Sequence, residues 1–147
     1  MIRFALLFLL LSSASMAVAE QAGVAPDAHL VVHDAWVRGM PPGTKNSAGY
    51  LVIENRGDKD DALVSVSVAK FRVTELHEMV RDRNAMAMRR HDEVPVPAHG
   101  TVTLAPGGMH LMLIDLQQPL QAGESLEGIL RFRNGGEKKV LLEVRAH

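Results

Sequence analysis

The sequence contains no cysteine among its 147 residues. This absence excludes disulfide bonds, thiolate catalysis, zinc sites with cysteine ligands, cysteine-ligated blue copper centres and a lipid anchor on an N-terminal cysteine. Aromatic residues are also scarce, at 4% of the chain. There is no basic excess, because 17 acidic residues outnumber 16 lysines and arginines. Binding to nucleic acid, which requires positive charge to neutralise phosphates, is therefore not expected.

The one long hydrophobic run is too short to span a bilayer. Residues 4–11 are apolar, Arg3 precedes them, and Ala17-Val18-Ala19 supplies the small residues of an A-x-A cleavage site. About 20 apolar residues are needed to cross a membrane. These features predict a cleavable signal peptide over residues 1–19. We expect an exported protein that does not insert into the membrane.

The rest of the chain shows a pattern of strands and turns. Residues 64–68 alternate apolar and polar side chains, as a half-buried strand does, and Asn134-Gly135-Gly136 is a strong hairpin signal. No window carries the apolar repeat of a helix. We expect a single all-β domain over residues 35–147, an antiparallel Greek-key β-sandwich or barrel, after an N-terminal tail over residues 20–34. The expected strands are 35–39, 48–54, 64–68, 73–80, 85–90, 101–105, 110–116, 126–133 and 140–144.

Methionine is concentrated in one part of this chain. Five of the eight methionines lie within residues 79–112. Three motifs in this region, His77-Glu78-Met79, Met86-Ala87-Met88 and His110-Leu111-Met112, each place two nitrogen or sulfur donors two residues apart. Residues i and i+2 of a strand share a face, so each motif directs both donors to the same side. A single methionine usually fills a core, but three such motifs together favour a metal site.

The first two motifs predict a hairpin with a defined pairing. A turn is expected within residues 81–84. A loop with an even number of residues places His77 opposite Met88 and Met79 opposite Met86, with Cβ atoms ~4.5–5.5 Å apart. A three-residue loop would break this pairing.

Bringing the third motif beside this hairpin assembles two imidazoles and two thioethers. His110 and Met112 follow Pro106-Gly107-Gly108 and are expected at the end of a sheet, within reach of solvent. Thioether sulfur favours Cu(I), whereas zinc and harder ions prefer carboxylate, imidazole or thiolate ligands. Because imidazole must be unprotonated to bind a metal, the affinity is expected to fall as the pH drops through about 6.5.

The spacing of the donors resembles the H-x10-M-x21-H-x-M motif of the PCuAC family of periplasmic copper chaperones. His77, Met88, His110 and Met112 match this motif. The resemblance implies a cupredoxin-like β-sandwich in which these four residues bind Cu(I). It also implies a periplasmic location and delivery of copper for assembly of cytochrome c oxidase with Sco-type proteins. Further segments that resemble the family are 34–38, 41–43, 48–55, 60–63 and 106–108.

Three functions remain open for such a site. We expect a monomeric Cu(I) chaperone that passes the ion to an apo cuproprotein or a Sco-type chaperone by ligand exchange. A copper-sequestering or tolerance protein would use the same ligands. The alternative from another class is a metal-free β-sandwich that serves as an interaction module. We do not expect an enzyme, because no catalytic triad or carboxylate pair can be assigned.

Other residues near the motifs have two interpretations. Met79 and Met86 share the face of the expected ligands, and they either line the site or fill the core. Charged residues also cluster around the expected turn. They form either an ordinary solvated face or a surface that steers an acidic partner. This group comprises Arg81, Asp82, Arg83, Arg89 and Arg90.

Overall fold

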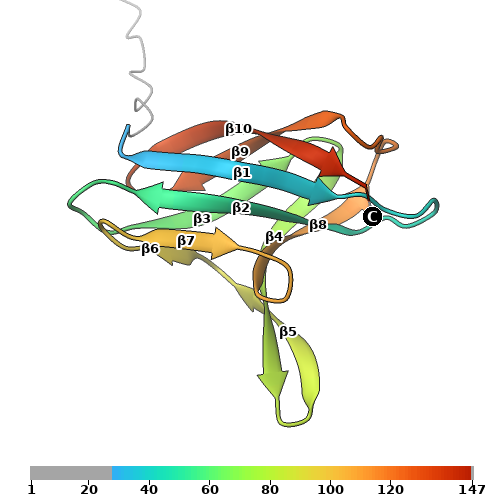
Figure 1. Ribbon diagram of the computed structural model, residues 1–147, viewed down its shortest axis with the longest axis horizontal. Helices are drawn as coiled ribbons and strands as arrows, with labels where there is room; N and C mark the ends of the chain where they lie inside the picture. Colours follow the sequence, from blue (N-terminus) through green and yellow to red (C-terminus); the bar gives the residue numbers. More distant parts are fainter. Residues whose placement is uncertain (1–27, 147) are drawn as a thin grey trace, which may run out of the picture.

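The computed structural model describes residues 28–146 as a twisted, mostly antiparallel sheet that folds around one core (Figure 1). The signal peptide expected over residues 1–19 lies outside the described residues, as does the tail before residue 28. The strands are β1 (Leu30–Arg38), β2 (Ser47–Asn55), β3 (Asp61–Val68), β4 (Phe71–Asp82), β5 (Ala85–His91), β6 (Val94–Val96), β7 (Thr101–Leu104), β8 (Met109–Leu116), β9 (Ser125–Phe132) and β10 (Gly136–Arg145).

Strand pairing follows the order β5-β4-β8-β2-β1-β10-β9-β3-β6, and β7 also pairs with β2. Only the pairing of β1 with β10 is parallel among the described strands. None of the described residues forms a helix, so none of them provides a helix that could cross a membrane. The expected all-β fold in a single domain is confirmed.

The two faces of β4 and β8 have different roles. Leu76 of β4 and Leu111 of β8 are buried in the apolar core, at 4% and 0% exposure. Their neighbours along the chain, His77, His110 and Met112, lie on the opposite face because side chains alternate along a strand. Burial of the leucines therefore determines which face presents the nitrogen and sulfur donors.

The first strand begins earlier than the sequence pattern predicts. β1 starts at Leu30, so residues 30–34, which were expected in the tail, belong to the sheet. Leu30 is buried, at 2% exposure. The register shifts between His33 and Trp36, and Asp34 has a φ of 51°. Such a bulge interrupts the alternation of side chains, which explains why no strand pattern is visible there.

Strand β6 is absent from the strands that the sequence predicts. Pro95 lies at its centre and pairs with Ala62 of β3. Proline lacks the N–H of a ladder hydrogen bond and is tolerated mainly at sheet edges. β6 is the last strand of the sheet order, so its position accommodates the proline.

The β4–β5 hairpin projects from the body of the domain (Figure 1). β4 is 12 residues long; its first part pairs with β8, and its second part pairs with β5. Within the described chain, β5 pairs with no strand other than β4. Residues 81–90, the end of this hairpin, are all exposed. The hairpin is therefore an arm that carries part of the donor set into solvent.

Candidate metal-binding site

The pairing of the β4–β5 hairpin differs from the predicted one by two residues. Met88 lies opposite Met79 instead of His77, and Met86 lies opposite Arg81 instead of Met79. The loop has an even number of residues, as the predicted pairing required, but the predicted partners were wrong. Because the shift is two residues and not one, the donors keep the same face of the hairpin.

The reason for the shift is the position of the turn. Asp82 pairs with Ala85, which leaves a two-residue loop of Arg83 and Asn84, and Arg83 adopts a positive φ of 53°. Glycine usually marks such a conformation in a hairpin loop. This loop has none, so the sequence limits the turn to residues 81–84 without locating its centre.

His77 is the central residue of the candidate site. It lies directly opposite His110 on β8, with ring centroids 6.0 Å apart and ring planes inclined by 57°. Glu75 lies opposite Met112, so Met112 is a diagonal neighbour of His77, as Met88 is on the other side. Diagonal neighbours lie about 7–8 Å apart, within reach of a long side chain.

The two histidines each leave one ring nitrogen available as a ligand. His110 is 5% exposed, and its Nδ1–H donates to the carbonyl oxygen of Gly108 at 2.9 Å. In His77, Nε2–H donates to the Glu75 carboxylate at 2.8 Å, and Nδ1 is buried without a hydrogen-bond partner. A buried, unpaired acceptor is costly. A metal ion at Nδ1 of His77 would remove that cost.

Glu75 holds His77 in this orientation, and the sequence analysis did not identify it. Its second oxygen lies 3.4 Å from Nη1 of Arg90. The hydrogen bond from His77 is the main cause of the lowered pKa of Glu75, and the positive charge of Arg90 adds to it. A carboxylate on the distal nitrogen of a metal-binding histidine fixes its tautomer and ring orientation. The sequence feature that could have identified Glu75 is its Glu-x-His spacing with His77, which puts both residues on one face of a strand.

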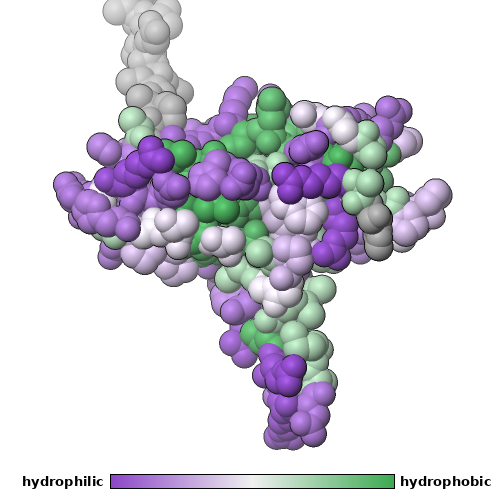
Figure 2. Space-filling view, in the orientation of Figure 1, coloured by the Kyte–Doolittle hydropathy of each residue, from purple (hydrophilic) through white to green (hydrophobic). Residues whose placement is uncertain are grey.

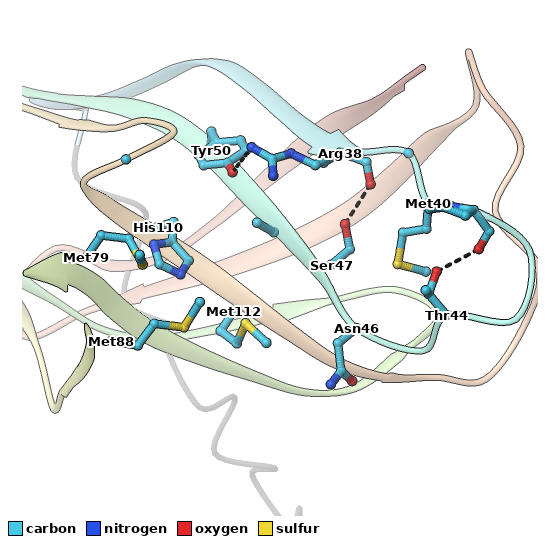
Figure 3. Close-up of a pocket in the computed structure, with 14 residues that line it drawn as sticks. Arg38, Met40, Thr44, Asn46, Ser47, Tyr50, Met79, Met88, His110 and Met112 are labelled. Carbon is cyan, nitrogen blue, oxygen red and sulfur yellow. Dashed lines mark hydrogen bonds between the residues drawn. The ribbon is translucent and has the colours of Figure 1, made fainter. Parts of the chain in front are cut away.

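A cavity of about 420 Å³ lies beside the histidines (Figure 3). Met79, Met88 and Met112 surround the imidazole of His110 at one end of the cavity, and Met40 lies at the other. Met79 therefore lines this cavity. Met40 comes from the loop between β1 and β2, and no spacing in the sequence connects it with the motifs. His77 does not line the cavity.

The donors at this cavity are mainly soft. Among residues 28–146 there is no group of three or more histidine, aspartate or glutamate side chains that could hold a metal ion. The imidazole of His110 and several thioethers line the cavity, and the imidazole of His77 faces that of His110. This donor set suits Cu(I) better than zinc or calcium. Met86 lies outside this cavity, and it is 53% exposed.

Comparisons with known proteins identify the family of this chain. Residues 30–144 match the family described as putative lipoprotein LpqE-like. The putative lipoprotein Lxx21020 from Leifsonia xyli is 32% identical over 115 residues, which is 78% of this chain and 68% of that protein.

Solved structures show the same fold. The copper-bound PCuAC domain from PmoF2 is 27% identical, with a TM-score of 0.72, over 84% of this chain and 97% of that domain. The Cu(I) form of DR1885 from Deinococcus radiodurans is 28% identical, with a TM-score of 0.66, over 86% of this chain and 85% of that chain. The resemblance noted in the sequence is confirmed, and the chain belongs to the LpqE-like family, whose fold is that of the PCuAC domains.

Proposed function

We propose that the protein binds one Cu(I) ion through His77, Met88, His110 and Met112. The observation that carries this proposal is the pair of facing histidines. In each ring one nitrogen makes a hydrogen bond that fixes the orientation of the ring, and the other nitrogen is left free to bind a metal. Met88 and Met112 flank His77 diagonally and add two thioethers. Copper-bound relatives with the same fold support the choice of metal.

The open position of the site favours transfer of copper over storage. Met88 is 55% exposed, whereas His110, which was expected within reach of solvent, is 5% exposed and borders the cavity together with Met112. All four ligands are uncharged, so the ion is held less tightly than by thiolates. A donor from a recipient can then replace one ligand before the others dissociate. We infer a metallochaperone that is not an enzyme.

The destination of the copper belongs to the same proposal. We infer that the protein acts in the periplasm as a monomer and supplies copper for cytochrome c oxidase, directly or through a Sco-type protein. The signal peptide expected over residues 1–19 supports export, and so does the description of the family as putative lipoproteins. To test the recipient, the copper-loaded protein is mixed with an apo Sco-type protein, and the copper content of the Sco-type protein is then measured.

Anaerobic titration with Cu(I), combined with X-ray absorption spectroscopy, tests the binding itself. The expected result is one equivalent bound, with both nitrogen and sulfur in the coordination shell. Sulfur can come only from methionine, because the sequence has no cysteine. A bound ion without sulfur neighbours would refute the proposed ligand set, and so would failure to take up Cu(I).

Replacing Glu75 with alanine is expected to weaken Cu(I) binding about 10–100-fold, the usual cost of losing a partner that orients a metal ligand. The variant leaves every proposed ligand in place but frees Nε2 of His77. Glu78→Ala is the matched control, because Glu78 is paired with His91 on the other face of β4. Competition with a Cu(I) chelator measures both variants. Equal affinities for the two variants would show that Glu75 does not position His77.

A further inference from the structure

The exposed methionines of the β4–β5 hairpin need an explanation beyond packing. Among the described residues, four large hydrophobic side chains are exposed, and two of them are Met86 and Met88. Figure 2 shows apolar side chains on the hairpin between the body of the domain and its hydrophilic end. Methionine normally fills gaps in a core. Met86 fills none, because it is 53% exposed on an arm that only β4 and β5 form.

Three thioethers form a row along one face of this hairpin. Met79 lies opposite Met88, and both line the cavity beside His110. Met86 is two residues from Met88 on the same strand, so it shares that face and lies one step nearer the turn. The row therefore runs from the candidate copper site toward the exposed end of the hairpin.

We infer that Met86 is a transient Cu(I) ligand, which takes the ion from the resident site and presents it to the recipient. The inference rests on the proposed Cu(I) binding. In this step a bond from copper to the sulfur of Met86 forms while the bond to His110 or Met112 breaks, and Met88 remains bound. Copper stays Cu(I) throughout, the released ligand leaves with its own electron pair, and no proton is transferred.

The geometry suits an exchange position better than a permanent ligand. Residues i and i+2 of a strand are about 6.6–6.8 Å apart along the chain. The unbranched side chains of Met86 and Met88 can bring their sulfur atoms to one ion from that distance. Met86 does not line the cavity that Met88, His110 and Met112 line. It lies nearer the turn than Met88, so copper reaches it by moving toward the end of the hairpin.

Met86→Leu tests this role, because leucine keeps the apolar bulk and removes only the sulfur. The protein is loaded with one equivalent of Cu(I) without oxygen, and transfer to excess bathocuproine disulfonate is followed by stopped-flow absorbance. We expect the transfer rate to fall about tenfold, while the equilibrium affinity stays within about twofold of the wild type. Met109→Leu is the matched control, because Met109 is half-buried and packs against the core. Both variants keep all the arginines of the hairpin, so attraction of the anionic chelator is unchanged.

The possible results separate this inference from the proposed function. If wild-type protein takes up Cu(I) and Met86→Leu releases it as fast as Met109→Leu does, the transient role is refuted and copper binding stands. If Met86→Leu loses affinity as strongly as Met88→Leu, Met86 is a resident ligand and the inference is wrong. If the wild type binds no Cu(I), the titration shows this before any rate is measured, and both proposals fail.

Discussion

Replacing both His110 and Met112 with alanine is expected to abolish measurable Cu(I) binding under competition with a chelator. We expect the affinity to fall more than about a hundredfold, because loss of an orienting partner alone costs about 10–100-fold. The double variant removes one imidazole and one thioether from the same face of β8, and it leaves His77 without its directly opposed partner. The remaining pair, His77 and Met88, cannot enclose the ion.

The control for this result removes the same chemical groups from elsewhere. In the variant His91→Ala, Met109→Ala, an imidazole and a thioether are lost, but His91 is paired with Glu78 and Met109 packs against the core. This control is expected to bind Cu(I) as the wild type does. Circular dichroism checks that both double variants keep the β-sheet. Wild-type affinity in the first variant would contradict the site assignment.

Replacing Leu111 with alanine is expected to have the opposite outcome, a large loss of stability with little change in copper binding. Leu111 lies between His110 and Met112 in sequence, but its side chain is 0% exposed in the core. Truncating a buried leucine to alanine lowers the free energy of unfolding by about 2–5 kcal/mol, depending on how far the cavity collapses. The Cu(I) affinity of the folded variant is expected to stay within about threefold of the wild type, since the donors lie on the other face.

Urea unfolding of the copper-free protein measures this effect, and Leu141→Ala provides the control. Leu141 is 68% exposed, so the same truncation there is expected to cost less than about 0.5 kcal/mol. Added Cu(I) should partly restore the stability of Leu111→Ala, because a ligand that binds only the folded state stabilises it. A folded Leu111→Ala variant that fails to bind Cu(I) would show that the two faces of β8 are not independent.

Strand content and the sharing of faces could be predicted from the sequence because both depend on local chemistry. Side chains alternate along any strand, so a donor at position i and another at i+2 must lie on the same side. In β1, which was expected too short, and β6, which was missed, a local rule is broken. Asp34 adopts a left-handed conformation within β1, and Pro95 occupies β6, where only an edge position tolerates it.

Which donors lie opposite each other could not be predicted from the local sequence. The two-residue shift of the hairpin follows from the turn at Arg83 and Asn84, a loop without glycine that the sequence does not locate. Because of this shift, His77 and Met88 are diagonal neighbours and not the directly opposed pair that was expected. Opposite His77 on β5 stands Arg90, and its opposed donor is His110 on β8, 33 positions later in the chain.

The sequence by itself determined which donors are present, that none is a thiolate, and which of them share a face. These properties follow from composition and from the two-residue period of a strand, and neither depends on distant contacts. Only the tertiary structure decided which donors meet, that Glu75 orients His77, and that Met40 borders the same cavity. Those contacts depend on strand register and on the path of loops, which the packing of the whole sheet sets.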